Sequence, residues 1–406
     1  MSGRSISVLH AVTDSLSTVL LRGQLAYLKE HGFDPALLCS PGKEVEEIRA
    51  RERYTVFTVA MRREIALVRD LKSLFEIWRL LSRIKPVICN SGTPKAGLLV
   101  GTAAWLTRVP CRVYTLRGLR LETASSLKRI ILTVTERVAC FCAHRVVCVS
   151  PSLRDKAISM GLVPRRKTVL LGAGSSNGVD PARFAPTAEK IELAAEIRRA
   201  LGIRPDQPVI GFAGRFTRDK GLPELVAAFQ LMKMDTPEIV LLLIGDYEEG
   251  DPVPEETRNA IRSLQGIFCV GFTSQMDLYY LTMDIFALPT HREGFPNTIL
   301  EAQAAGLPVI TTDATGAVDA IEDGVTGVLT PVGDARKLAE AVLSLLSDPD
   351  KMRLMGQSGR VRVLREFRSE MIWQALSLLY RDMLQEVGYP LAADSRAEAV
   401  GCTQIK

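Results

Sequence analysis

Two carboxylates, Glu293 and Glu301, lie eight residues apart, and a Gly-Phe-Pro-Asn segment follows the first of them. Ionised carboxylates only accept hydrogen bonds, so they suit donors such as sugar or ribose hydroxyls and not phosphate groups. The pair therefore favours a hydroxyl-rich ligand. Glutamates at this spacing also occur by chance on surface loops and helix faces, so this interpretation needs support from the surrounding chain.

A pair of cations, Arg215 and Lys220, lies five residues apart just behind Gly214. Residues 208–213 read as a buried strand and residues 222–232 as a helix. Two cations and a helix N-terminus at such a turn can converge on a diphosphate and stabilise its charge as it leaves. The alternative is two surface cations in a turn.

The elements around Glu293 repeat this strand, loop and helix order. Residues 284–289 form an apolar run typical of a buried strand, a Gly/Pro loop follows, and Asn297 or Thr298 would cap the next helix. Ligands of open parallel sheets bind beyond the carboxyl ends of the strands. The sequence thus predicts an α/β fold with both charged pairs at that edge.

The motif Glu293-x7-Glu301, with Gly294 after the first glutamate and Glu-Ala-x-Ala-x-Gly-x-Pro-Val from Glu301, resembles the signature of glycosyltransferase family four. Members are retaining sugar-nucleotide transferases of the GT-B fold. The resemblance covers nearly the whole chain and is strongest over residues 211–333. It implies two Rossmann-like domains that face each other across a cleft.

The resemblance also assigns roles to the charged residues. It implies that Arg215 and Lys220 bind the donor diphosphate, that Glu301 holds the nucleotide ribose, and that Glu293 contacts the transferred sugar. Further donor contacts are expected from Gly214, Gly294, Phe295, Pro296 and Asn297.

The implied reaction is sugar transfer with retention of configuration, without a metal or another cofactor. No Asp-x-Asp metal site is found, since Asp313 and the Asp348-Pro-Asp350 segment lack partner ligands. The leaving phosphate would take the acceptor's proton, so no separate base is required. We therefore interpret His10, His144 and His291 as structural, and note that His291 lies beside Glu293.

The N-terminal half supplies candidates for binding an acceptor. The segment Thr93-Pro-Lys95-Ala-Gly resembles one in bacterial polysaccharide glycosyltransferases of the family, and Lys95 could meet an acceptor phosphate. Arg117 stands where many members have a histidine that contacts the transferred sugar, and an arginine can hold phosphate bidentately. A second departure is Asp14-Ser-Leu-Ser, where relatives have a Gly-Gly loop after the first strand.

Charge is divided unevenly along the chain: residues 1–175 hold 28 Lys and Arg against 13 Asp and Glu, and the rest holds 23 against 33. Without aromatic RNA motifs or a Lys/Arg block, this does not indicate nucleic-acid binding. It fits an anionic membrane surface or a diphosphate-bearing acceptor, with solvated helix faces as the alternative. In residues 69–85 an apolar stripe of Leu71, Leu74, Phe75, Trp78 and Leu81 is predicted to face the core.

The resemblance to enzymes of capsule, O-antigen and exopolysaccharide assembly implies a nucleotide-sugar donor, expected to be a UDP-sugar. The implied acceptor is a glycan or a polyprenyl-diphosphate-linked sugar. The longest uncharged apolar stretch, residues 96–106, is too short to span a bilayer. Eight cysteines, mostly in apolar runs, read as reduced thiols, so we expect a cytoplasmic protein. The basic N-terminal half and a lipid-linked acceptor would place it at the inner face of the cytoplasmic membrane.

The predicted organisation is an acceptor-binding domain at residues 1–175 and a donor-binding domain at 176–370. The family resemblance implies that a helix at 371–390 returns to the first domain, and a tail at 391–406, low in apolar residues, should be disordered. Gly172-x-Gly174 is followed by Asn-Gly-Val-Asp-Pro, not by a helix, and so does not indicate a dinucleotide site.

Two other functions remain open from the sequence. One is a non-catalytic nucleotide-sugar binding subunit of a polysaccharide assembly complex, because Arg117 replaces the usual histidine. The other is a sugar-nucleotide epimerase of the same fold, which would need additional catalytic carboxylates and histidine that we do not locate.

Overall fold

The computed structural model describes residues 5–51, 54–62, 64 and 66–390. These residues form two α/β units. The first runs to Asn177 and also includes the segment from Ser369, and the second is Gly178–Arg368. The predicted boundaries after residues 175 and 370 lie two residues from these divisions. The tail predicted to be disordered, 391–406, lies outside the described residues.

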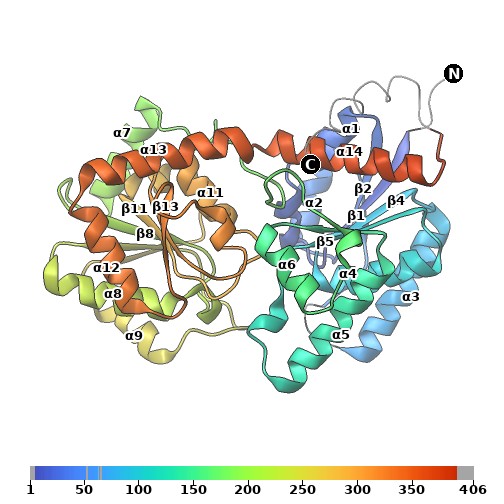
Figure 1. The fold of residues 1–406 in the computed structure, drawn as a ribbon, viewed down its shortest axis with the longest axis horizontal. Coiled ribbons are helices and arrows are strands. Elements are labelled where there is room, and N and C mark those ends of the chain that lie inside the picture. The colour runs from blue at the N-terminus through green and yellow to red at the C-terminus, as the bar shows by residue number, and fades with distance from the viewer. Residues whose placement is uncertain (1–4, 52–53, 63, 65, 391–406) are drawn as a thin grey trace. The chain divides into compact units, whose positions relative to one another are not determined.

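The first unit is a parallel sheet between helices, and in the described residues its seven strands have the order β3-β2-β1-β4-β5-β6-β7 (Figure 1). The strands are β1 (Ile6–Ala11), β2 (Phe33–Cys39), β3 (Thr55–Thr58), β4 (Ile88–Ser91), β5 (Cys111–Leu116), β6 (Arg145–Cys148) and β7 (Thr168–Val169). The helices are α1 (Gln24–Glu30), α2 (Lys43–Arg51), α3 (Leu67–Ile84), α4 (Pro94–Leu106), α5 (Ser126–Cys142), α6 (Pro151–Ser159) and α14 (Ser369–Glu386).

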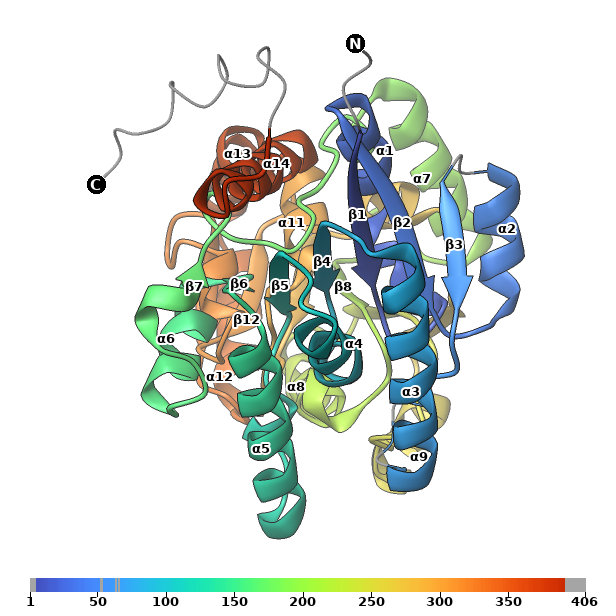
Figure 2. The same ribbon diagram turned by 90° about the vertical axis from the view of Figure 1, so that its right-hand side faces the viewer.

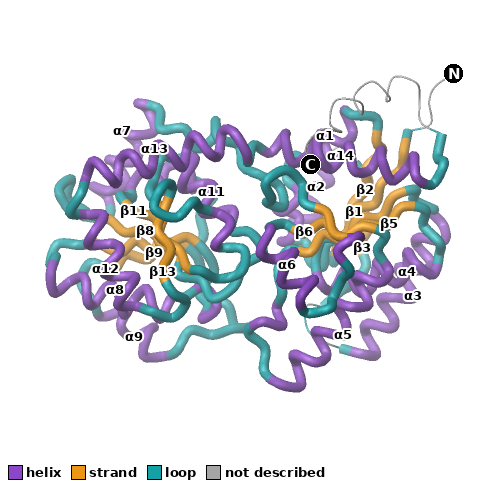
Figure 3. The backbone as a smooth tube through the Cα atoms, in the orientation of Figure 1, coloured by secondary structure: helices purple, strands orange, loops and turns teal. Residues whose placement is uncertain are grey.

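The second unit repeats the design with six parallel strands in the order β10-β9-β8-β11-β12-β13 (Figure 3). Its strands are β8 (Val209–Ala213), β9 (Val240–Ile244), β10 (Ile267–Gly271), β11 (Ile285–Leu288), β12 (Val309–Thr312) and β13 (Gly327–Thr330). Its helices are α7 (Ala188–Ala200), α8 (Leu222–Asp235), α9 (Glu255–Ser263), α10 (Met276–Tyr279), α11 (Asn297–Ala304), α12 (Ala335–Leu346) and α13 (Pro349–Glu366). Both orders are doubly wound, which confirms the prediction of two Rossmann-like domains.

The doubly wound order fixes where each unit can bind a ligand. The chain reverses its direction of travel between β1 and β4 in the first sheet, and between β8 and β11 in the second. Loops leaving the carboxyl ends of two such neighbouring strands diverge and leave a crevice. The segments that follow β8 and β11 carry Lys220 and Glu293, and those that follow β1 and β4 carry Thr13 and Thr93.

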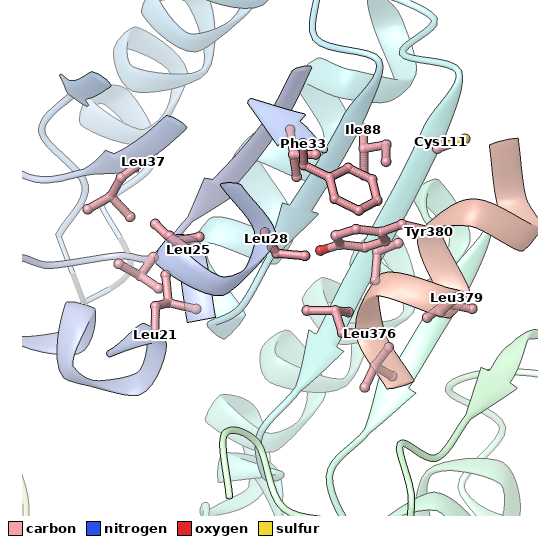
Figure 4. Close-up of a cluster of buried hydrophobic side chains, with 14 of the residues drawn as sticks. Leu21, Leu25, Leu28, Phe33, Leu37, Ile88, Cys111, Leu376, Leu379 and Tyr380 are labelled. Atoms are coloured by element: carbon pink, nitrogen blue, oxygen red, sulfur yellow. The ribbon is translucent and has the colours of Figure 1, made fainter. Parts of the chain in front are cut away.

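The last helix, α14, packs on the first sheet, as predicted. Tyr380 and Leu376 are buried in an apolar cluster with Phe33 of β2 and Leu28 of α1 (Figure 4). Residues more than 340 positions apart in sequence therefore share one core. Because α14 supplies much of this cluster, removing it would expose one face of the sheet.

Leucines at helical spacing over residues 19–31, before Gly32, predict a single helix there, and the structure instead breaks this segment at Gly23. A 3₁₀ helix (Leu16–Leu21) precedes this glycine and α1 follows it. Gly23 has a left-handed φ of 77°, and a Cβ there would lie 2.5 Å from the ring of Trp373. The tryptophan of α14 thus requires a glycine at the break.

The prediction that the stripe on α3 faces the core is only partly right. Leu81 is buried and Leu74 is partly buried against the core, but Leu71, Phe75 and Trp78 are 67%, 55% and 40% exposed. The other buried positions of α3 are Ser73 and Ile77. Apolar side chains on adjacent faces of the helix made the sequence pattern ambiguous.

A buried acid in the first unit leads to a pH prediction. Glu136 of α5 is 4% exposed and accepts a 2.8 Å hydrogen bond from the Tyr114 hydroxyl. Burial, partly opposed by this hydrogen bond, raises the pKa of Glu136 from 4.5 to about 7. The folded chain therefore holds a proton that the unfolded chain releases, so this contribution to stability is present below pH 4.5 and is lost as the pH rises through 7.

We expect Glu136→Gln to remove this loss, since glutamine stays neutral and can still accept from Tyr114. Calorimetry should find the variant more stable than the parent by about 3 kcal/mol at pH 8.5, with little difference at pH 4.5. A stability difference that is the same at both pH values would contradict a buried, titrating Glu136.

Candidate functional site

The centre of the candidate site is an ion pair between Lys220 and Glu293, whose side chains are 15% and 14% exposed. Lys220 ends the 3₁₀ helix Arg218–Lys220 behind β8, and Glu293 lies in the loop behind β11. These strands are neighbours in the sheet. The structure thus brings together two residues that the sequence assigned to the donor diphosphate and the transferred sugar.

Asp219, which the sequence analysis missed, holds the two loops in place. Its buried carboxylate accepts hydrogen bonds from the Thr217 hydroxyl and from Arg292, both at 2.6 Å. Its backbone carbonyl accepts from Thr290 Oγ1 at 2.9 Å and from the His291 N–H at 2.8 Å. Burial opposes ionisation of Asp219, but the charge of Arg292 and the Thr217 hydroxyl outweigh it and lower the pKa. An acid between Arg218 and Lys220 was the signal available in the sequence.

His291 ties the same loop to α8. Its Nε2 lies 2.9 Å from Glu224 Oε1, and this hydrogen bond raises the pKa of the imidazole. Burial opposes ionisation of Glu224, but the hydrogen bond from His291 outweighs it and lowers the pKa of the carboxyl. This contact agrees with a structural role for His291.

Arg215 lies at the more exposed side of the site. It forms an ion pair with Glu248 behind β9, and its side chain is 52% exposed. Its charge also contributes to the low pKa of Asp219, which places it near the Lys220 loop. Exposed ion pairs contribute little free energy, so an anionic ligand can compete with Glu248 for Arg215.

Helix α11 begins at Asn297 with Pro296 as its N-cap, so the prediction that Asn297 or Thr298 caps it is wrong. No side-chain hydrogen bond caps this helix, and the positive end of its dipole favours an anion nearby. The loop before it is held by Gly316, where a Cβ would lie 2.4 Å from the Gly294 oxygen. Gly294, Phe295 and Pro296 are buried, and Gly214 follows β8.

Glu301 lies one turn into α11 and accepts a 2.9 Å hydrogen bond from the Tyr280 hydroxyl. Tyr280 is fully buried, and its burial together with the charge of Glu301 raises its pKa well above the usual value. The phenol therefore stays protonated and orients the carboxylate. Tyr280 could not be identified as a site residue from the sequence, because the contact between Tyr280 and Glu301 depends on how the segment before β11 folds.

The three acceptor-side candidates of the first unit differ in their surroundings. Thr93 accepts a hydrogen bond from the Thr13 N–H at 3.0 Å, and the two hydroxyls are 2.7 Å apart. Lys95 forms a 2.6 Å ion pair with Asp70, and both side chains are largely buried. Arg117 is the exception, since its Nε and Nη1 are buried and have no hydrogen-bond partner.

The position of Gly221, between Lys220 and α8, leads to a stability prediction. Its φ is 73°, and a Cβ there would lie 1.8 Å from the Pro289 carbonyl oxygen at the end of β11. Gly324 has nearly the same φ, 74°, but nothing lies within 4 Å of its Cβ position. Gly324→Ala should cost about 1 kcal/mol of left-handed strain, and Gly221→Ala about 2 kcal/mol more, because backbone must move. Equal melting temperatures for the two variants would contradict this close packing.

In the part of the chain that the structure describes, no group of three or more His, Cys, Asp or Glu side chains is arranged to hold a metal ion. None of the described helices is long and apolar enough to cross a membrane.

Known protein families match both units. The model described as "Glycosyl transferase 4-like domain" matches residues 18–174, and "Glycosyl transferases group 1" matches residues 194–362. The capsular polysaccharide biosynthesis glycosyltransferase CapM of Staphylococcus aureus is 38% identical over 379 residues, which is 93% of this chain and 98% of CapM. A UDP-Gal:alpha-D-GlcNAc-diphosphoundecaprenol alpha-1,3-galactosyltransferase of Escherichia coli is 26% identical, over 88% of this chain and 91% of its own.

Among solved structures, HepE of Anabaena in complex with UDP-glucose matches with a TM-score of 0.78, at 20% identity, over 93% of this chain and 100% of HepE. At that identity the likeness supports the fold, two parallel α/β domains of the GT-B type. The family assignment rests on the 38% identity to CapM over almost the whole length of both chains. The chain therefore belongs to the group 1 glycosyltransferases, as the Glu293-x7-Glu301 motif predicted, and bacterial capsule and O-antigen glycosyltransferases are among its homologues.

Proposed function

We propose that the chain transfers a sugar from a UDP-sugar to a polyprenyl-diphosphate-linked sugar or glycan in bacterial surface polysaccharide assembly. Transfer retains the anomeric configuration and needs no metal. The observation that carries this proposal is the Lys220–Glu293 pair, held where β8 and β11 diverge and flanked by a helix without a side-chain cap.

Each part of the site has a task in this reaction. The donor diphosphate lies on the N-terminus of α11 and takes Lys220 and Arg215 as counter-ions. Lys220 then exchanges its bond to Glu293 for a phosphate oxygen, which frees Glu293 to accept from a sugar hydroxyl. Glu301, oriented by Tyr280, accepts from the ribose hydroxyls.

The bond changes balance without an added base. The bond between the anomeric carbon and the diphosphate oxygen breaks, and the acceptor oxygen attaches to the same face of the sugar. The acceptor's proton passes to the departing diphosphate. Lys220, Arg215 and the helix dipole stabilise the negative charge that grows on the diphosphate, which is the part a metal ion plays in other transferases.

The choice of donor and acceptor is supported by the relatives. The name of the Escherichia coli homologue gives UDP-galactose as donor and a sugar on diphosphoundecaprenol as acceptor. HepE, which has the same fold, was crystallised with UDP-glucose. CapM acts in capsule biosynthesis. Hexosyl and N-acetylhexosaminyl transfer both fit these relatives.

The test is release of free nucleotide from a panel of UDP-, GDP- and ADP-sugars in EDTA, with and without a polyprenyl-diphosphate-sugar acceptor. We expect one UDP-sugar to turn over, only when the acceptor is present, and the product to keep the donor's anomeric configuration. Inverted product, or turnover abolished by EDTA and restored by a divalent cation, would refute that part of the proposal. Tight donor binding without turnover would favour a binding subunit.

We also propose that the first unit rests on an anionic lipid surface at the inner face of the cytoplasmic membrane. Helices α3, α4 and α5 pack side by side on one face of its sheet (Figure 2). They expose large apolar side chains next to cations, which favours binding at an anionic interface. The exposed apolar residues of α3 and α5 are Leu67, Val68, Leu71, Phe75, Trp78, Leu127, Ile130, Ile131, Val134 and Phe141, and the exposed cations are Arg69, Lys72, Arg79, Arg83, Lys128, Arg129 and Arg137.

Co-sedimentation with liposomes tests this membrane proposal. We expect binding to vesicles with anionic lipid, weak binding to neutral vesicles, and loss of binding in a Phe75→Asp/Ile130→Asp variant. Exposed residues tolerate such changes, so the melting temperature should stay within a few degrees. Equal binding to neutral and anionic vesicles would refute the proposal.

A further inference from the structure

The first unit contains a partly buried cation, two of whose guanidinium nitrogens have no hydrogen-bond partner. Arg117 follows β5 directly, and its Nε and Nη1 atoms are buried without a hydrogen bond. Within the described residues it forms no ion pair. Burial lowers its pKa to about 10, so the guanidinium is still charged at neutral pH.

The side chains around Arg117 are neutral. Burial, and then the charge of Arg117, lowers the pKa of His10 to about 3, so this imidazole is uncharged. The Tyr380 hydroxyl lies 3.1 Å from His10 Nε2 and accepts from Asn90 Nδ2 at 2.8 Å. Burial also raises the pKa of Tyr380, which stays protonated. A buried, unpaired charge costs free energy, and natural proteins retain such costs mainly at functional sites.

The guanidinium lies against the turn that leads into α4. A Cβ at Gly92 would be 3.3 Å from Arg117 Nε and 3.4 Å from Nη2, so a larger residue would crowd this side of the guanidinium. Thr93 is the N-cap of α4 but makes no capping hydrogen bond, because its hydroxyl is engaged with Thr13. The positive end of a 13-residue helix and the Arg117 guanidinium therefore meet where β1 and β4 diverge.

We propose that Arg117 and the N-terminus of α4 form an oxyanion site that takes a phosphoryl group of the acceptor. This inference rests on the proposed function, since it names the part of the acceptor that the first unit recognises. The planar guanidinium offers two parallel N–H donors to the oxygens, and the helix adds backbone N–H groups. A carboxylate on an acidic sugar has the same charge and fork, so the experiment must separate the two sources.

The first test measures binding by the whole chain, saturated with UDP so that a diphosphate site in the second unit is occupied. Inorganic pyrophosphate is titrated by calorimetry into the parent and into Arg117→Met. We expect the Kd to rise about 30-fold or more in the variant, as for a lost charge-assisted pair of hydrogen bonds. Unchanged pyrophosphate affinity would overturn the proposal.

The matched control is Arg112→Met, at the other end of β5. The Arg112 guanidinium is partnered, with Nε donating to the Cys142 carbonyl at 2.7 Å and Nη1 to that of Val109 at 2.8 Å. Arg112→Met should lower the melting temperature and leave pyrophosphate binding unchanged. Without anion, Arg117→Met should melt at or above the parent's temperature, because it removes an unpaired buried charge. A large loss of stability in Arg117→Met alone would mark Arg117 as structural and overturn the proposal.

Kinetics then identify the source of the anion. In Arg117→Met the KM for a polyprenyl-diphosphate acceptor should rise about 30-fold, with the donor KM within twofold and no change for the same sugar on a neutral carrier. A rise in the donor KM instead, or an effect confined to acceptors with a uronic acid, would overturn the phosphoryl assignment. Arg117-dependent pyrophosphate binding without turnover of any donor would refute the proposed glycosyl transfer and leave the anion site standing.

Discussion

Lys220→Ala should lower kcat for acceptor-dependent nucleotide release by about a thousandfold, or about 4 kcal/mol in activation free energy. The ammonium opposes the charge that grows on the diphosphate as the sugar leaves, so its removal should cost more in the transition state than in the ground state. The KM for the donor should therefore change much less than kcat. Steady-state kinetics with one UDP-sugar and a saturating acceptor measure both.

The matched control is Arg218→Ala, two residues earlier in the same 3₁₀ helix. Arg218 is 62% exposed and forms a 3.1 Å ion pair with Asp251. Arg218→Ala therefore removes the same charge from the same loop but leaves the partner of Glu293 in place. We expect the control to keep kcat within a few-fold. Because Lys220→Ala leaves Glu293 unpaired, its melting temperature must be measured beside its rate. Equal losses of kcat in the two variants would show that net charge of the loop, not the position of Lys220, supports the reaction.

Much of the fold could be predicted because it depends on local patterns. Apolar runs such as those of β8 and β11 alternate with amphipathic helices, and this alternation determines a doubly wound parallel sheet. The charged pairs could be placed for the same reason, since Lys220 and Glu293 follow β8 and β11, which are neighbours in the sheet. The return of α14 to the first unit came instead from the family resemblance, because no local pattern indicates which sheet a terminal helix covers.

The parts that could not be predicted depend on contacts between distant segments. The burial of Asp219 and its bond to Arg292 arise only when the loops behind β8 and β11 meet, 73 residues apart. Trp373, 350 residues away, makes Gly23 a helix break. Arg117 lacks hydrogen-bond partners at Nε and Nη1 because of the side chains that surround it in the fold. No sequence pattern can predict the absence of such partners. The prediction for α3 was only partly right, because apolar side chains lie on two adjacent faces of this helix and only packing decides which face is buried.

Glu301→Gln should raise the Kd for UDP about 30-fold, or about 2 kcal/mol, if the carboxylate accepts hydrogen bonds from the ribose. The substitution keeps the shape of the side chain and an oxygen for the Tyr280 hydroxyl, so α11 should fold as before. Calorimetric titration of UDP measures the change. Transfer itself should slow only at donor concentrations below saturation, since Glu301 does not touch the reacting bond in the proposed mechanism.

The same contact can also be removed on the ligand, by taking away the ribose hydroxyls. The two changes together form a thermodynamic cycle. With 2′,3′-dideoxy-UDP, the parent chain should lose the same 30-fold or so, and Glu301→Gln should lose nothing further, because the hydroxyls and the carboxylate are two ends of one contact. The coupling free energy from the four affinities should then be about 2 kcal/mol. Additive losses would mean that Glu301 stabilises the site through Tyr280 and α11, and that the ribose hydroxyls are bound elsewhere.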